Sequence, residues 1–108
     1  MSISSSVWAQ ACIVHSHAER LDVKVCQANL TIPEQLFHNG FCRPDLPGQT
    51  VDVTFVEQCP EGAFGKCTQA QVNNMPYRQD IYYYGVASDA AYLKPYCEQK
   101  SHGQWQAP

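Results

Sequence analysis

Six cysteines in a chain of 108 residues are the feature that most restricts how this sequence can fold. They are spread along the chain as Cys12, Cys26, Cys42, Cys59, Cys67 and Cys97. No two of them have the Cys-x-x-Cys spacing of a zinc or redox site, so we interpret them as disulfides formed in an oxidising compartment. Each bridge is expected to contribute about 2–4 kcal/mol by restricting the unfolded chain. The alternative is six reduced, buried thiols in a cytosolic protein.

The pairing of these cysteines is left open by the sequence, because six cysteines allow many connectivities. We favour Cys59–Cys67, since these two residues bracket Pro60 and Gly62, a turn expected to close a β-hairpin. Nearness in sequence and matching positions after two expected helices then suggest Cys12–Cys26 and Cys42–Cys97.

Alternation of apolar and polar residues predicts half-buried strands over 21–26 and 51–56. Four other segments are strand candidates: 12–14, interrupted by His15-Ser16-His17; 64–68, paired with the preceding strand as a hairpin; the β-prone run 81–84; and an edge strand over 104–106.

Two short helices are expected between these strands. Thr31 and Glu34 have the spacing of a capping box for a helix over 32–39, which Gly40 should end. Ser88 is positioned to cap a second helix, and Pro95 should kink or restart it. The fold class predicted is α+β, with an antiparallel sheet of four to five strands and both helices on one face.

The N-terminal residues 1–11 are expected to be a flexible segment, either the remnant of a leader or an artificial extension. Ala9-Gln10-Ala11 has the form of a signal-peptidase site. A single disulfide-rich domain follows over 12–108. We do not expect a lipid anchor on Cys12, because it would remove one thiol and leave an odd number.

Charge and hydropathy exclude several classes of partner. The net charge is −3, only 16% of residues are charged, and no basic run is present. Nucleic acids and anionic membrane surfaces are therefore not expected as partners, since both need clustered Lys and Arg. No stretch approaches the roughly 20 apolar residues of a membrane-spanning helix.

The segment Cys59–Thr68 reads Cys-Pro-x-Gly-x-x-Gly-x-Cys-Thr, and it is followed by Tyr82–Tyr84, by Cys97-Glu98 and by the tail Gly103-x-Trp105. This order resembles small six-cysteine exported proteins and lipoproteins of Gram-negative bacteria. The resemblance covers roughly residues 55–106, and over 12–54 it extends only to the order of the cysteines and a short helix. It implies disulfides and a periplasmic or secreted location, but no catalytic residue, because the family has no assigned activity.

Tyrosines and one tryptophan form the candidate binding surface: Tyr77, Tyr82, Tyr83, Tyr84 and Trp105. Tyrosine is common at recognition surfaces because it offers a large area and one hydroxyl with few rotors. Alternation places Tyr82 and Tyr84 on one sheet face and Tyr83 on the other. The alternative, which we favour, is that either Tyr83 or the pair Tyr82 and Tyr84 packs beneath the second helix against Tyr92 and Leu93.

His15 and His17 are the candidate metal ligands, because residues two apart project from the same face of a strand. Four residues are candidates for a third ligand: Glu19, Asp22, His38 and His102. The alternative, two exposed loop histidines, is favoured. No nucleophile motif or phosphate-binding loop is present, and we expect neither a cofactor nor a catalytic residue.

These features favour a non-enzymatic, exported protein that binds another protein or the cell envelope. One alternative is an inhibitor or toxin-like effector that acts on a secreted hydrolase. A second alternative is a small metal-dependent enzyme that uses His15 and His17.

Overall fold

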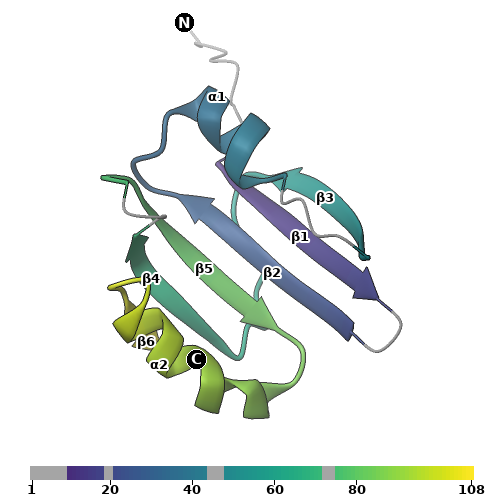
Figure 1. Ribbon diagram of the computed structural model, residues 1–108, viewed down its shortest axis with the longest axis vertical. Helices are drawn as coiled ribbons and strands as arrows, with labels where there is room; N and C mark the ends of the chain where they lie inside the picture. The colour runs from purple at the N-terminus through teal and green to yellow at the C-terminus, as the bar shows by residue number, and fades with distance from the viewer. Residues whose placement is uncertain (1–9, 19–20, 44–47, 72–74) are drawn as a thin grey trace, which may run out of the picture.

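The computed structural model describes residues 10–18, 21–43, 48–71 and 75–108. Its strands form one antiparallel sheet with the order β3-β1-β2-β5-β4-β6 (Figure 1). The six strands are β1 (Ala11–Ala18), β2 (Leu21–Asn29), β3 (Thr50–Val56), β4 (Gly65–Gln71), β5 (Arg78–Tyr84) and β6 (Gln104–Gln106). The α+β class is confirmed, whereas four to five strands is wrong, because the short edge strand β6 forms and completes a six-stranded sheet.

Strand β1 runs without interruption through the histidine pair, where the sequence predicted a break. His15 pairs with Lys24 on β2 and with Asp52 on β3, so strands on both sides hold this segment extended. The strand also begins at Ala11, inside the segment assigned to a flexible terminus, and Ala11 is buried. Residues 1–9 of that segment lie outside the described part of the chain.

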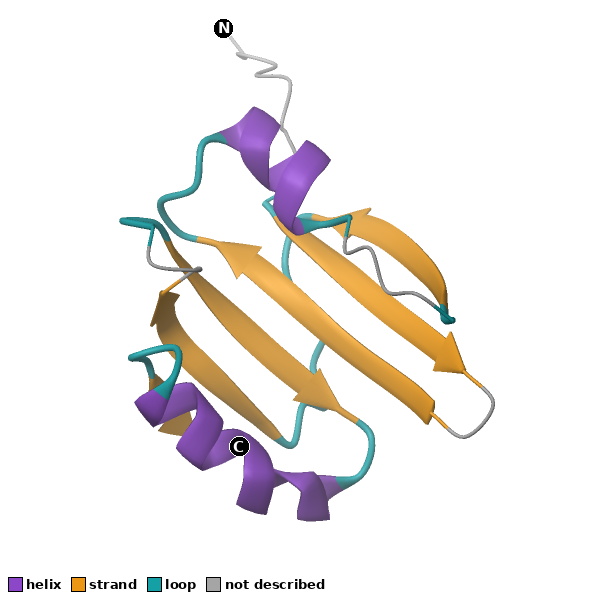
Figure 2. Ribbon diagram, viewed as in Figure 1, coloured by secondary structure: helices purple, strands orange, loops and turns teal. Residues whose placement is uncertain are grey.

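Both helices lie on the same side of the sheet (Figure 2). The first, α1 (Glu34–Leu36), continues as a π-helical segment over Phe37–Phe41. The second, α2 (Ala90–Gln99), follows a 3₁₀ turn over Ala87–Asp89. No helix in the described ranges has both the length and the apolar composition needed to cross a membrane.

The helix ends differ from those predicted. The hydroxyl of Thr31 accepts a hydrogen bond from the backbone N–H of Arg78 at 2.8 Å, so the capping box with Glu34 does not form. The side chain of Asn29 instead accepts a hydrogen bond from the N–H of Ile32 at 2.7 Å. Gly40 lies within the π-helical segment and does not end it.

In α2, Pro95 lies inside the helix without interrupting it. Ser88, the expected cap of this helix, belongs to the 3₁₀ turn before it, and no side chain caps α2.

The register of the sheet assigns paired strand residues to one of two faces, because paired residues on neighbouring strands project to the same side. The alternation is interrupted only in β4, by an irregularity between Cys67 and Ala70. One row crosses all six strands through Phe55, Cys12, Gln27, Ile81, Cys67 and Trp105. We call this side the helix face, since Cys12 and Cys67 form disulfides with Cys42 and Cys97 at the two helices. The adjacent row belongs to the opposite face and contains Thr54, Ile13, Cys26, Tyr82, Lys66 and Gln106.

The chain consists of two halves with the same order of elements. Each half has two antiparallel strands, a helix and a third strand that pairs with the first strand of its half. The strand order β3-β1-β2-β5-β4-β6 is therefore symmetric about the central pairing of β2 with β5. In each half, one disulfide joins the first strand to the helical segment, Cys12–Cys42 in the first and Cys67–Cys97 in the second.

The third disulfide, Cys26–Cys59, fastens the connection between the halves to the opposite face. All three favoured pairings are thus wrong. The expected hairpin is wrong as well: β3 lies at one edge of the sheet, and β4 lies beyond β1, β2 and β5. Residues 57–64, which we call the crossing segment, bridge about 19 Å, or four inter-strand spacings of about 4.8 Å, where the sequence suggested a tight turn.

Two small cores lie on the helix face, one beneath each helix. The first contains the fully buried Phe37 with Cys12, Val14, Ile32 and Cys42. The second contains Cys67, Ala70 and Cys97, with Ile81, Tyr83 and Trp105 packed against them. Among the described residues, five of the six largest fully buried side chains are half-cystines, and the sixth is Phe37. The disulfides therefore stabilise a domain whose apolar core is small.

Candidate functional site

The tyrosine run is divided between the two faces of the sheet, as alternation predicted. Tyr83 pairs with Val25 and lies on the helix face, whereas Tyr82 and Tyr84 pair with Cys26 and Lys24 on the opposite face. All three tyrosines are half-buried. The run therefore contributes to two different surfaces.

On the helix face, Tyr83 is the centre of an aromatic group. Its ring centroid lies 5.6 Å from that of Trp105 and 6.4 Å from that of Phe64. Burial, and to a smaller degree the neighbouring Tyr96, raises the pKa of Tyr83 to about 12. The Tyr83 hydroxyl is therefore neutral at physiological pH and can both donate and accept a hydrogen bond.

An apolar groove of about 500 Å³ opens beside this group, between the end of β2, β5 and α2. We call it the helix-side groove, and its apolar lining comprises Val23, Phe64, Tyr83, Val86, Tyr92 and Leu93. Lys24 and Asp89 also line the groove and contribute one charge of each sign.

Large apolar side chains of the helix-side groove remain open to solvent. Tyr92 is 79% exposed, Val86 is 64% exposed and Val23 is 40% exposed. Tyr96, one helical turn after Tyr92, is 59% exposed. Exposed apolar side chains are ordinary when they are scattered, whereas these are grouped around one groove, which makes it the candidate site of this fold.

The favoured packing of the tyrosines beneath the second helix is met only in part. Tyr83 and Leu93 line the same groove, and Tyr83 packs against the core beneath α2. Tyr92 points away from that core, as its 79% exposure shows.

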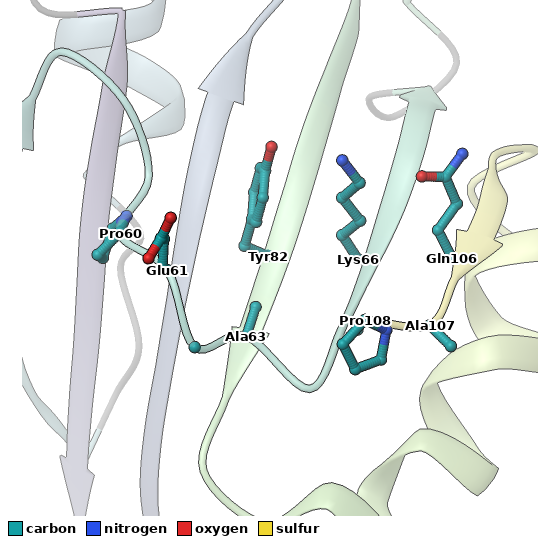
Figure 3. Close-up of a pocket in the computed structure, with 10 residues that line it drawn as sticks. Pro60, Glu61, Ala63, Lys66, Tyr82, Gln106, Ala107 and Pro108 are labelled. Atoms are coloured by element: carbon teal, nitrogen blue, oxygen red, sulfur yellow. The ribbon is translucent and has the colours of Figure 1, made fainter.

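On the opposite face, Tyr82 stands in a second groove, of about 360 Å³ (Figure 3). Lys66 and Gln106 project beside it from β4 and β6, and the crossing segment forms the other wall with Pro60 and Glu61. The Nζ atom of Lys66 lies 5.1 Å from the centroid of the Tyr82 ring, a cation–π distance. Lys66 thus lies over the Tyr82 ring, and the groove around Tyr82 is smaller than the helix-side groove of about 500 Å³.

Tyr84 fastens the crossing segment and thereby fixes the shape of this second groove. Its hydroxyl donates a 2.6 Å hydrogen bond to the carbonyl oxygen of Pro60. Burial, and secondarily Tyr82, raises the pKa of Tyr84. Lys24 lies with its Nζ atom 5.5 Å from the Tyr84 ring centroid. Tyr84 thus has a structural role that the sequence did not indicate.

Tyr77 and Trp105, the other members of the predicted surface, lie at two separate places. Tyr77 packs against the core beneath α1, away from the aromatic group. Trp105 covers Gly65 so closely that a Cβ atom on Gly65 would overlap its ring. Gly65 is therefore required by this packing. Gly62 has a φ of +100°, which favours glycine, but it lies in the crossing segment and not in the predicted hairpin turn.

His15 and His17 project from the opposite face of β1 with their ring centroids 3.9 Å apart. The Nε2 atom of His17 lies 3.5 Å from an oxygen of Asp52. The two histidines are thus half-buried strand residues, where the favoured alternative placed them in a loop. His38 lies on the helix face, stacked on Phe55 with ring centroids 4.7 Å apart, so it cannot join them.

The remaining third-ligand candidates are also placed. His102 is exposed beside β6, beyond the far edge of the sheet from β1. The side chains of Glu19 and Asp22 lie outside the described residues. Among the described side chains, no three His, Cys, Asp or Glu residues are grouped so as to hold a metal ion. All six cysteines are in disulfides, which leaves no thiol nucleophile.

Sequence reasoning did not identify Val23 and Val86 as groove residues, and it did not predict that Tyr92 is exposed. Val86 directly follows Gly85, which ends the strand, and an apolar residue after a strand stop carries no signal of exposure. Tyr92 is apolar and helical, so the pattern alone assigns it to the core. Only the position of α2 over the β4–β6 side of the sheet leaves it in solvent.

A scan against protein-family models found no match to this chain, and searches of curated proteins and of solved structures found none either. The functional interpretation therefore depends on the chain's own residues and geometry.

Proposed function

We propose that this chain is an exported, non-enzymatic binding protein that uses the helix-side groove to hold an apolar segment of a protein partner. The observation that supports this most directly is the group of exposed Val86 and Tyr92 side chains around the half-buried Tyr83. Hydrophobic and aromatic side chains with a few polar groups at the rim are typical of recognition sites.

The groove suits a protein segment better than a small polar ligand. Its volume of about 500 Å³ accommodates two or three apolar side chains, and its lining is predominantly hydrophobic. Tyr92 can close over a bound segment at little entropic cost, since it has few rotors. Lys24 and Asp89 in the lining can orient that segment through ion pairs with acidic and basic residues.

Export is supported by the three disulfides, which persist in oxidising compartments such as the periplasm or the extracellular space. The likeness to six-cysteine exported proteins of Gram-negative bacteria points to the same compartments. Disulfides also favour binding by keeping the scaffold rigid, which lowers the entropy lost when the partner is held.

Site-specific photo-crosslinking tests the proposal. A photoreactive phenylalanine analogue replaces Tyr92 in the disulfide-bonded protein, which is then exposed to the envelope and culture-supernatant fractions of the source cells. The matched control carries the same analogue at Leu30, which is 43% exposed at the far end of β2. We expect a discrete adduct from position 92 and none from position 30.

The identified partner then allows a quantitative measurement. Tyr92→Ser and Val86→Ser should each weaken its affinity by roughly ten- to thirtyfold, as expected for anchor residues, whereas Leu30→Ser should leave the affinity unchanged. Equal adducts at positions 92 and 30, or an affinity that Tyr92→Ser does not alter, would refute the proposal. If the partner is a secreted hydrolase that the protein inhibits, the inhibitor alternative is the correct form of this function.

A further inference from the structure

The two edges of the sheet are unequal. β6 at one edge has three residues, whereas β3 at the other has seven and pairs with β1 in an unbroken register. Every second residue of an edge strand directs its backbone N–H and C=O outward, so a long edge is a template for another strand. Proteins usually block such edges with charged side chains, Pro, a bulge or a short strand. In β3, Thr-Val-Asp-Val-Thr-Phe-Val, Asp52 is the single charged residue, and the strand has no Pro and no bulge.

The helix-face side of β3 is apolar up to this edge. Val51, Val53 and Phe55 project there, with Arg43, around a depression of about 360 Å³. Val51 and Val53 pack against the core beneath α1, while Phe55 is 38% exposed and stacks on His38. An added strand would cover this row and extend the core sideways.

The β3 sequence is complementary to itself in the antiparallel direction. When two copies are aligned about Val53, Val51 of each faces Phe55 of the other, so the helix-face row consists of apolar pairs only. On the opposite face, Asp52 of each copy faces Thr54 of the other, and the two carboxylates are not opposed. Aligning the strands about Asp52 would instead oppose the two carboxylates directly, which is unfavourable.

We propose that β3 pairs with β3 of a second copy of this chain, in the antiparallel register centred on Val53. Two six-stranded sheets then join into one of twelve strands. The pairing repeats at the edge what the fold already contains at its centre, where β2 and β5 join the two halves in an antiparallel, two-fold arrangement. The protein's net charge of −3 is too small to prevent association.

This dimer has a geometric consequence for binding. An antiparallel pairing of identical strands has its two-fold axis perpendicular to the sheet, so the helix faces of both copies lie on the same side. The two helix-side grooves would open on that side, at the two ends of the long sheet. Dimerisation does not depend on the proposed function, but it would make the grooves bivalent toward a partner that presents two matching segments.

Thr54 offers a test of both the edge and the register, because it is exposed and faces Asp52 of the second copy. Sedimentation equilibrium of the disulfide-bonded protein should show a monomer–dimer equilibrium. Thr54→Glu places two pairs of like charges across the interface and should raise the dissociation constant by roughly five- to twenty-five-fold. Thr54→Lys should lower it by a similar factor, and Asp52→Lys combined with Thr54→Glu should restore dimerisation.

The control is Gln106→Glu, which adds the same charge at the other edge and should leave the dissociation constant unchanged. Circular dichroism confirms that each variant is folded. A wild-type protein that remains monomeric at millimolar concentration would overturn the proposal, and the edge would then be unoccupied or would accept a strand of another protein. A dimer that responds equally to Thr54→Glu and Thr54→Lys would show that the interface lies elsewhere.

Discussion

Removing the Cys26–Cys59 bridge should have two measurable effects: a loss in the free energy of unfolding of the whole domain, and a local opening of the segment that the bridge holds. In the double variant Cys26→Ala/Cys59→Ala, the unfolded chain regains the entropy of a loop with a sequence separation of 33 residues. The loop-entropy relation gives a loss of about 3.7 kcal/mol in the free energy of unfolding. Domains of this size have about 5–15 kcal/mol in total, so the variant should remain folded but be much less stable.

The matched control is Cys67→Ala/Cys97→Ala, whose sequence separation is 30 residues. The same relation gives about 3.6 kcal/mol, so the two variants should lose nearly equal stability. They should differ in where the structure opens. Without Cys26–Cys59, the crossing segment should exchange its amide protons faster and α2 should not, whereas loss of Cys67–Cys97 should release α2 and the helix-side groove.

Guanidinium denaturation followed by circular dichroism measures the stability, and hydrogen exchange with mass spectrometry locates the opening. A loss below about 1 kcal/mol for Cys26→Ala/Cys59→Ala would contradict the loop-entropy argument. Equal acceleration of α2 exchange in both variants would contradict the assignment of each bridge to one region. Peptide mapping under non-reducing conditions should first recover the three observed pairs.

Three further outcomes are expected. Gly65→Ala should destabilise the protein by about 1–3 kcal/mol, because the added methyl overlaps the Trp105 ring; an unchanged denaturation midpoint would refute this. The pKa of Tyr83 is raised from 10.0 to about 12 by burial, so its contribution to stability is fully present below pH 10 and is lost as the pH rises toward 12. Denaturation at several alkaline pH values should show a decline in wild-type protein that is smaller in Tyr83→Phe. Asn29→Ala should cost about 1–2 kcal/mol of unfolding free energy, since it removes the hydrogen bonds to the N–H and C=O of Ile32; a loss of only a few tenths of a kcal/mol would refute the role of these two hydrogen bonds.

Local patterns predicted the strands well because side-chain alternation is a local property. The alternation over 21–26 and 51–56 and the β-prone run 81–84 each correspond to a strand, and even the short 104–106 segment pairs at the edge. The α+β class follows from the same local patterns, because a helix lies between the second and third strands of each half. The division of the tyrosine run between two faces was predicted for the same reason.

Pairing across the sheet was not predictable from local patterns. Cys59, Pro60 and Gly62 have the composition of a hairpin turn, but β1 and β5 each pair with two strands and thereby place β3 and β4 on opposite sides. The predicted disulfide pairings were wrong for the same reason. Two cysteines can form a bridge only if they lie close together on the same face of the sheet, and nearness in sequence does not determine that. Thr31 shows the same competition, since its hydroxyl accepts a hydrogen bond from Arg78, which is 47 residues away.

Of the candidate site, the sequence predicted only the part that lies on the strand β5. The sequence identified Tyr83 as a candidate binding residue. The groove beside Tyr83 forms only because α2 packs at one particular place on the sheet, and the sequence did not predict that place. That position is fixed by the Cys67–Cys97 bridge and by Trp105 on Gly65, which are contacts between distant segments. Composition and alternation contain no information about them.

The disulfide connectivity also determines how this chain can acquire its bridges. The first four cysteines pair among themselves and the last two pair with each other. A chain that enters an oxidising compartment N-terminus first can therefore complete both early bridges once Cys59 has emerged. When Cys67 and Cys97 follow, no earlier thiol remains to compete for them. The order of the cysteines thus limits the mispaired species that an isomerase would otherwise have to correct.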